Sequence, residues 1–232
     1  MRVHAITLGC QMSAADGYDT VAALARLGWQ RADTPEQADA IVLTTCSVRK
    51  HAEHRAISLI GRLRAWKAAA PGRMLVIAGC VAERLGPELT RRFPYVDLVV
   101  GARQAGRYPE LIAAELNRRF APAAIPAGSP CRAPSGNILA PSTATVTIMR
   151  GCDCACSYCI VPSVRGPETC RPPEDILAEV RAKVAAGARE VTLLGQRVNA
   201  YRFGRDGKTT DFPTLLRAVD RTEGLARLRF MS

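Results

Sequence analysis

The sequence predicts an α/β protein with two domains, and three observations lead to this prediction. Short apolar runs alternate with amphipathic stretches over residues 1–120, which is typical of a parallel sheet covered by helices on both faces. Residues 121–142 contain five prolines, and this density excludes a continuous helix and a central strand. An apolar, β-branched run opens after this linker, so a second α/β unit is expected over residues 143–232.

The first domain is expected to contain four strands and four main helices. The strands are predicted over residues 3–8, 40–45, 74–78 and 96–100, where short apolar runs lie between polar segments. The helices are predicted over residues 16–27, 48–70, 83–93 and 108–119, and Gly28 and Pro71-Gly72 end the first two. Thr34 and Pro35 are typical of the N-cap and first position of a further helix.

The second domain is expected to begin a (β/α) barrel. A strand is predicted over residues 143–149, and a cysteine-rich loop follows its carboxyl end, where barrels of this kind keep their chemistry. A helix over residues 173–186, a strand over 190–194, a polar loop over 195–211, a helix over 212–223 and a strand over 228–231 come next. The last strand is expected to leave an apolar edge unpaired.

The composition is that of a globular chain with an anionic partner. Of its 232 residues 48% are apolar, which is enough for a packed core and excludes a disordered chain. The net charge of +11 favours a partner such as RNA, although an Arg-rich solvated surface carries the same charge. The basic residues of the helix predicted over 48–70 are more simply interpreted as such a solvated face.

The sequence shows no signal peptide and no membrane-spanning segment. Its most apolar run, around residues 74–82, is too short to cross a bilayer. We therefore expect a cytoplasmic protein without a membrane partner. In that compartment thiols are reduced, so the nine cysteines are expected to hold metal or to do redox chemistry more often than to form disulfides.

Three cysteines follow three predicted strands of the first domain. Cys10 comes after the first strand, Cys46 after the second and Cys80 after the third. Because the carboxyl ends of parallel strands meet at one edge of a sheet, the three thiols are expected to converge there. This matching placement favours a metal site over three separately buried thiols, the common fate of free cysteine.

The loop between Met149 and Arg165 carries a second group of three cysteines. Cys152, Cys156 and Cys159 form a C-x3-C-x2-C pattern, with Tyr158 before the last of them. Three thiolates on one loop suit one corner of an iron–sulfur cluster, and a four-iron cluster bound in this way keeps one iron open. Zinc is the alternative, but zinc sites usually take two C-x2-C pairs and this loop has one.

These motifs resemble those of a known family. The loop around Cys152 is similar to the signature of the radical S-adenosylmethionine enzymes, and the segment from Leu193 to Tyr201 is similar to the methylthiotransferases among them. Three segments resemble the cysteine motifs of that family's N-terminal domain: Leu8-Gly-Cys-Gln-Met12, Thr44-Thr-Cys-Ser-Val-Arg49 and Ala78-Gly-Cys-Val-Ala82. The chain departs from the family at Ser13 and Thr45, where asparagine is common, and at Cys154, where cysteine is unusual. Cys154 is either a spectator or a fourth ligand that would close the open iron.

The resemblance implies two [4Fe–4S] clusters and S-adenosylmethionine as cofactors. The implied metal ligands are Cys10, Cys46 and Cys80 for an auxiliary cluster that holds the sulfur to be inserted, and Cys152, Cys156 and Cys159 for the cluster that coordinates S-adenosylmethionine. One S-adenosylmethionine supplies a methyl group, and a second gives the radical that activates the substrate. Arg165, Gln196 and Asn199 follow predicted strands and are candidates for binding cofactor or substrate, with a turn cap or surface salt bridge as the alternative for each.

The resemblance also implies a substrate and partners. It is nearest to the tRNA-modifying members, which transfer a methylthio group to C2 of N6-isopentenyladenosine beside the anticodon. The expected partners are a tRNA anticodon stem-loop and an electron donor such as flavodoxin or ferredoxin, and the expected state is a monomer. The alternatives are methylthiolation of a ribosomal-protein aspartate or of threonylcarbamoyladenosine in tRNA. A non-catalytic fragment that binds iron–sulfur clusters or zinc is the alternative of another class.

The resemblance covers nearly all of this chain, whereas the chain matches only part of such an enzyme. The radical S-adenosylmethionine core over residues 143–232 is therefore expected to be incomplete, and the family's C-terminal RNA-binding β-barrel is expected to be absent. Cys131 in the linker and Cys170 in the core are expected not to be ligands.

Overall fold

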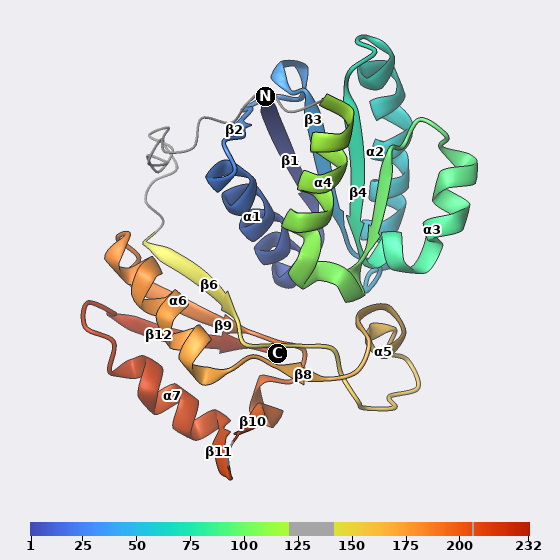
Figure 1. The fold of residues 1–232 in the computed structure, drawn as a ribbon. Coiled ribbons are helices and arrows are strands. Elements are labelled where there is room, and N and C mark those ends of the chain that lie inside the picture. The colour runs from blue at the N-terminus through green and yellow to red at the C-terminus, as the bar shows by residue number, and fades with distance from the viewer. Residues whose placement is uncertain (121–141, 206) are drawn as a thin grey trace. The chain divides into compact units, whose positions relative to one another are not determined.

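The chain divides into two compact units, Met1–Arg132 and Ala133–Ser232, each with its own sheet and core (Figure 1). The computed structural model describes residues 1–120, 142–205 and 207–232. The predicted proline-rich linker and Cys131 lie outside these residues, apart from Ser142 at the linker's end.

The first unit is built on a five-stranded parallel sheet with the order β2-β1-β3-β4-β5. The strands are β1 (Arg2–Leu8), β2 (Gln30–Arg31), β3 (Ala40–Thr45), β4 (Met74–Gly79) and β5 (Leu98–Gly101). Every residue of β3 and β4 is buried. Successive side chains of a strand point to opposite faces, and Ile41 and Leu43 accordingly enter one core cluster while Ala40 and Val42 enter the other.

Helices cover both faces of this sheet (Figure 1). They are α1 (Gln11–Arg26), α2 (Lys50–Ala68), α3 (Cys80–Arg92) and α4 (Tyr108–Phe120), with short 3-10 turns η1 (Pro35–Gln37) and η2 (Ala102–Arg107). On one face α2 and α3 bury side chains such as Ile60 and Leu89. On the other face α1 and α4 bury Leu24, Ile112 and Leu116. The predicted α/β fold class is confirmed.

Some predicted boundaries in this unit are wrong, and the differences concern the ends of the strands. Helix α1 begins at Gln11 instead of residue 16, and α3 begins at Cys80 instead of residue 83. Gly79 at the end of β4 has φ +102 and ψ −160, a backbone conformation that only glycine adopts readily. It therefore allows α3 to start directly after the strand. The helix predicted after Thr34 is a single 3-10 turn, and the two-residue strand β2 was not predicted.

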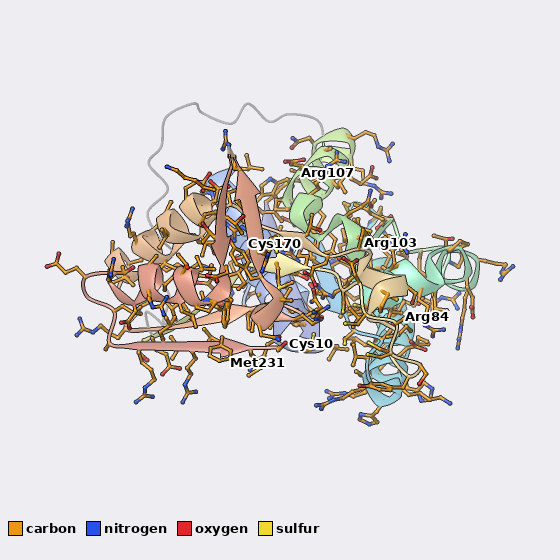
Figure 2. All side chains as sticks on the ribbon, turned by 90° about the horizontal axis from the view of Figure 1, so that it is seen from below. Cys10, Arg84, Arg103, Arg107, Cys170 and Met231 are labelled. Atoms are coloured by element: carbon orange, nitrogen blue, oxygen red, sulfur yellow. The ribbon has the colours of Figure 1, made fainter. Side chains whose placement is uncertain are left out.

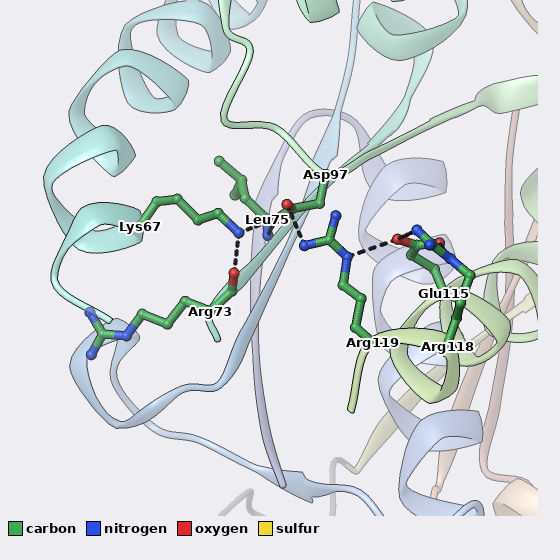
Figure 3. A network of polar contacts seen from close by, with 7 residues as sticks. All are labelled: Lys67, Arg73, Leu75, Asp97, Glu115, Arg118 and Arg119. Carbon is green, nitrogen blue, oxygen red and sulfur yellow. Dashed lines mark hydrogen bonds and ion pairs between the residues drawn. The ribbon is translucent and has the colours of Figure 1, made fainter. Parts of the chain in front are cut away.

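A buried carboxylate joins three elements of the first unit (Figure 3). Asp97 Oδ2 accepts hydrogen bonds from Lys67 Nζ on α2 and from the Leu75 amide on β4, both at 2.6 Å. Arg119 Nη1 on α4 lies 2.6 Å from Asp97 Oδ1. Only 9% of the Asp97 side chain is exposed, so these charge-assisted bonds are poorly screened by water. Asp97 thus ties a helix on each face to the central sheet.

Replacing Asp97 with asparagine is expected to lower the free energy of unfolding by about 2 kcal/mol. Asparagine keeps the size of the side chain but removes the charge, and hydrogen bonds to charged groups contribute about 1.5–3 kcal/mol each. Urea denaturation measures the loss. The control is Glu110→Gln, because the Arg107–Glu110 pair is 3.5 Å apart with both side chains more than half exposed. Such pairs contribute about 0–1 kcal/mol, and equal losses in the two variants would contradict the role of Asp97.

The neighbouring Glu115 is held ionised by arginines of its own helix (Figure 3). Arg118 Nη2 and Arg119 Nε donate to Glu115 Oε1 at 2.6 and 2.8 Å. These hydrogen bonds lower the pKa of Glu115 from 4.5 to about 2. Because the pKa is depressed in the folded state, the stabilisation is complete above the ordinary value and is lost as the pH falls towards 2.

The second unit is built on a three-stranded parallel sheet with the order β12-β9-β6. The strands are β6 (Thr143–Thr147), β9 (Glu190–Leu194) and β12 (Arg227–Met231), and the helices packed on them are α6 (Pro173–Ala185) and α7 (Phe212–Asp220). One core cluster joins Val146, Val191 and Leu193 of the sheet to Ile176 and Leu215 of the helices. These elements begin a βα repeat, as predicted.

Several smaller elements lie between the strands and helices of this repeat. They are β7 (Met149–Arg150) paired with β8 (Thr169–Cys170), α5 (Val161–Arg165), η3 (Val198–Ala200), and the antiparallel hairpin of β10 (Arg202–Arg205) and β11 (Lys208–Asp211). The region predicted as a polar loop over 195–211 therefore contains a hairpin. At the sheet edge β12 exposes 55% of Phe230 and 44% of Met231, although the Phe230 ring packs edge-on against Phe212 at 5.1 Å. Among the described residues, no helix combines the length and the apolar character that a bilayer crossing needs.

Candidate metal centres

The first cysteine triad lies at the carboxyl ends of three adjacent strands. In the sheet register Leu8 pairs with Thr45, and Thr45 pairs with Gly79. Cys46 and Cys80 come directly after this row, and Cys10 follows one residue later. Cys46 and Cys80 are 2% and 1% exposed, whereas Cys10 is exposed. The structure therefore brings the three predicted ligands to one edge of one sheet.

Two thiols of this triad, those of Cys10 and Cys46, interact with each other. A hydrogen bond with the Cys46 thiol, followed by burial, raises the pKa of the Cys10 thiol well above its ordinary value. Cys10 Sγ lies 3.6 Å from Ser13 Oγ, and the Val48 amide donates to Cys46 Sγ at 3.4 Å. A metal must therefore displace the Cys10 proton when it binds.

Thr45 fixes the turn that carries Cys80. Its hydroxyl donates to the Ala78 carbonyl at 2.6 Å and accepts from the Val81 amide at 3.3 Å. Ser13 Oγ in turn donates to the Thr45 carbonyl at 3.3 Å. The two positions at which this chain departs from the resembled family, Ser13 and Thr45, thus form one buried network between the cysteines.

Replacing Thr45 with valine is expected to lower the free energy of unfolding by about 1–3 kcal/mol. Valine has nearly the same shape as threonine, but it leaves the Ala78 carbonyl and the Val81 amide without this partner. An unmade hydrogen bond to a buried group usually costs about 1–3 kcal/mol. Urea denaturation measures it, with Thr90→Val as the control because Thr90 is exposed and bonds only within its own helix. A Thr45→Val loss no larger than that of the control would show that the hydroxyl does not fix the turn.

The second triad lies on the loop after β7, and two backbone hydrogen bonds shape this loop. The Cys152 amide donates to the Gly166 carbonyl at 3.1 Å, and the Cys159 amide donates to the Cys156 carbonyl at 3.0 Å. Gly151 has φ +76, and a Cβ atom there would lie 1.9 Å from the Pro167 carbonyl oxygen. Only glycine therefore lets the loop meet the segment before β8. Cys152 is 8% exposed, Cys159 is half-buried, and Cys156 is exposed.

Cys154 has a partner that the sequence did not indicate. Arg197 Nη1 donates to Cys154 Sγ at 2.9 Å and lies 3.8 Å from Glu168 Oε2. Arg197 stands between the two predicted site residues Gln196 and Asn199. The Leu193–Tyr201 segment drew attention to this region, but no sequence signal pairs Arg197 with a cysteine 43 residues away.

The other candidate residues of the second unit differ in their surroundings. Arg165 ends α5 and is 6% exposed. Gln196 follows β9, and its buried Oε1 has no hydrogen-bond partner among the described residues. Asn199 is exposed in η3. Cys170 lies in β8, where burial raises the pKa of its thiol. Of these candidates, Gln196 has a buried oxygen, Oε1, that could accept a hydrogen bond from a ligand.

The donor sets fit clusters better than single ions. Within residues 1–120, 142–205 and 207–232, no three His, Cys, Asp or Glu side chains are grouped so as to hold one metal ion. A structural zinc needs four ligands around one point. A four-iron cluster presents separate irons to separate thiolates, so a set of three cysteines suits it.

Two family models match this chain. The model described as uncharacterized protein family UPF0004 matches residues 2–101, and the model of the radical SAM superfamily matches residues 146–225. The two matches fall on the two structural units, and each contains one of the cysteine triads.

Solved structures with the same fold share little sequence. The radical S-adenosylmethionine methyltransferase TsrM from Kitasatospora setae, with tryptophan substrate and a SAM analogue bound, aligns with a TM-score of 0.55 and 15% identity. The alignment covers 85% of this chain and 48% of that chain. The same enzyme with cobalamin and a [4Fe-4S] cluster bound gives a TM-score of 0.54. This likeness supports the fold.

Curated relatives are much closer in sequence. The tRNA-2-methylthio-N(6)-dimethylallyladenosine synthase of Desulfosudis oleivorans is 42% identical over 233 residues, covering 99% of this chain and 50% of the relative. The synthase of the same name from Sorangium cellulosum is 41% identical, covering 100% of this chain and 51% of the relative. The chain thus spans about half the length of these relatives. Both family models match in order, and the identity to these relatives extends along the whole chain, so the chain is similar to them in both of its units.

Proposed function

We propose that this chain binds two [4Fe–4S] clusters and S-adenosylmethionine and serves the methylthiolation of tRNA at C2 of N6-isopentenyladenosine beside the anticodon. The observation that carries the proposal is a pair of cysteine triads, one per unit, in a chain that is 42% identical to a tRNA-2-methylthio-N(6)-dimethylallyladenosine synthase. The proposed ligands are Cys10, Cys46 and Cys80 for one cluster and Cys152, Cys156 and Cys159 for the other.

The residues around the second triad support a bound cofactor. When bound, the cluster and S-adenosylmethionine supply the one-electron chemistry that activates an inert C–H bond. Three cysteines leave one iron for the amino and carboxylate groups of S-adenosylmethionine. The unpartnered Oε1 of Gln196 offers an acceptor to a donor group of a ligand. Arg165 and Asn199 are assigned to cofactor or substrate binding with it.

The charge of the chain supports a nucleic-acid partner. Arg103 and Arg107 on η2 and Arg84 on α3 carry guanidinium groups on the first unit (Figure 2). The side chains of Arg103 and Arg107 are 54% and 65% exposed. Helix η2 follows β5 at the sheet edge where the first triad lies. We assign a tRNA anticodon stem-loop as substrate, flavodoxin or ferredoxin as electron donor, and a cytoplasmic monomer as the working state.

Metal analysis after anaerobic reconstitution tests the cofactors. Iron, acid-labile sulfide and zinc are measured per chain, and about eight irons are expected for two [4Fe–4S] clusters. Zinc with little iron would overturn the proposal and leave a structural metal protein. Cleavage of S-adenosylmethionine by the reduced, reconstituted protein then separates an enzyme from a non-catalytic cluster-binding fragment.

The substrate is tested separately. An anticodon stem-loop with N6-isopentenyladenosine, one with threonylcarbamoyladenosine, and the ribosomal-protein substrate of the family are offered in parallel. Product on the first is expected. Product on only one of the other two would reassign the chain to that branch of the family.

A further inference from the structure

The N-terminal end of α2 carries positive charge that no acidic side chain neutralises. Arg49, Lys50 and Arg55 are exposed, and within the described part of the chain none of them takes part in an ion pair. Glu53, the one acidic residue of the helix, is only 13% exposed and is bound by Arg84 of α3 (Figure 2), whose Nε donates to Glu53 Oε2 at 3.2 Å. The three cations therefore face solvent without a counter-charge.

This arrangement differs from an ordinary solvated helix face. The exposed arginines of η2 have acidic partners: Arg103 Nε lies 3.4 Å from Glu83 Oε1, and Arg107 Nε lies 3.5 Å from Glu110 Oε2. The N-terminus of a helix is also the positive end of its dipole, where cations are unfavourable and anions are stabilised, and no side chain caps the N-terminus of α2. The sequence thus gathers cations where the helix disfavours them, and an anion from outside the chain would offset this effect.

We propose that Arg49, Lys50 and Arg55, here called the α2 surface, bind the phosphate backbone of RNA and hold it at the edge of the sheet where the first triad lies. Arg49 follows Cys46 by three residues. The inference rests on the proposed function for the identity of the RNA, which is the tRNA anticodon stem-loop. It adds a binding site for that RNA on the first unit.

The extent of the α2 surface suits a chain of phosphates. A helix rises about 1.5 Å per residue, so the positions from Arg49 to Arg55 spread the charges over about 9 Å along the helix axis. One phosphate group is smaller than this, whereas several phosphates of one strand match it. The two arginines also present planar forks that bind phosphate oxygens in pairs. Since β3 ends at Thr45 and α2 begins at Lys50, RNA bound here lies at the triad's edge of the sheet.

The test compares two matched pairs of substitutions in the full reconstituted chain. One pair is Arg49→Gln with Arg55→Gln, and the control pair is Arg62→Gln with Arg64→Gln, which removes the same charge from exposed positions in the C-terminal half of α2. Fluorescence anisotropy measures the affinity for an anticodon stem-loop containing N6-isopentenyladenosine over a range of salt concentrations. The first pair is expected to bind about tenfold more weakly, with a salt slope smaller by about 1.4, since each phosphate contact to a single strand contributes about 0.7. The control pair is expected to bind like the original chain.

Several results would overturn the inference. Equal losses in the two pairs would show that only the total charge matters, and no loss in the first pair would show that the α2 surface is not used. A loss that follows a fall in iron content would assign these arginines to the cysteine loop instead. An equal loss of affinity for a polyglutamate peptide would assign the surface to acidic proteins. If the stem-loop is methylthiolated but the first pair binds it normally, the inference fails and the proposed function stands. If the original chain binds no stem-loop, the proposed substrate fails with the inference.

Chemical labelling of Lys50 gives a second measurement on the original chain, without any substitution. Its amine is acetylated in the presence and absence of the stem-loop, and mass spectrometry compares the rates. Lys208, which is exposed on β11 of the second unit, is the control. The RNA is expected to protect Lys50 more than Lys208. Protection of Lys50 no greater than that of Lys208 would contradict the proposal.

Discussion

Alanine at Cys152, Cys156 and Cys159 together is expected to lower the iron content of the reconstituted chain from about eight to about four per chain. The first triad belongs to a different compact unit with its own sheet and core. It should therefore keep its cluster when the second is lost. Iron and acid-labile sulfide analysis measures the result.

The corresponding variant with alanine at Cys10, Cys46 and Cys80 is expected to lose the iron of the first cluster, again about four irons per chain. Cys170→Ala is the matched control, because Cys170 is also half-buried in the second unit but stands outside both triads, and it should keep all the iron. A triple variant that retains its full iron would remove that triad from the proposal.

Replacing Gly79 with alanine is expected to lower the free energy of unfolding by about 4 kcal/mol. Gly79 has φ +102 and ψ −160, a region that costs other residues about 1–3 kcal/mol. A Cβ atom there would also lie 2.3 Å from the Thr45 carbonyl oxygen on β3, and overpacking of this kind adds about 1–3 kcal/mol. Because the next residue is Cys80, the substitution should weaken iron binding at the first triad as well.

The matched control for this prediction is Gly61→Ala. Gly61 is exposed within α2, and a Cβ atom at this position would meet nothing within 4 Å. Alanine is the better helix former, so the control should gain about 0.5–1 kcal/mol. Urea denaturation of both variants decides: a Gly79→Ala chain as stable as the original would show that the strand-to-helix junction tolerates a side chain.

The alternation of apolar runs was enough to predict the architecture. The strands predicted over residues 40–45 and 190–194 coincide with β3 and β9, because both are short apolar runs and both are largely buried. The hairpin of β10 and β11 escaped prediction, since segments such as Lys208–Asp211 are polar and mostly exposed. Helix α1 begins at Gln11, earlier than predicted. Its N-cap Cys10 makes no side-chain hydrogen bond, so the sequence carries no capping signal at that point.

The site was predictable to the extent that it depends on strand ends. A cysteine after each of three parallel strands implies a common edge, and the register of β1, β3 and β4 places them there. The contact between Arg197 and Cys154 was beyond the sequence, because it depends on how the segment after β9 folds back onto the cysteine loop. The same holds for Thr45, whose hydroxyl bonds reach residues of the next strand and helix.

The spacing of the two triads has a consequence for how iron and folding depend on each other. Cys10, Cys46 and Cys80 are 36 and 34 residues apart, whereas Cys152, Cys156 and Cys159 are 4 and 3 residues apart. The entropy lost in closing a loop grows with its length, so an unfolded chain would gather the second set of thiols far more easily than the first. A ligand stabilises a folded state only to the extent that the unfolded state does not bind it. Of the two proposed clusters, the one at the sheet edge would therefore stabilise the folded chain more, and the one on the loop would have the greater chance to assemble while the chain is still unfolded.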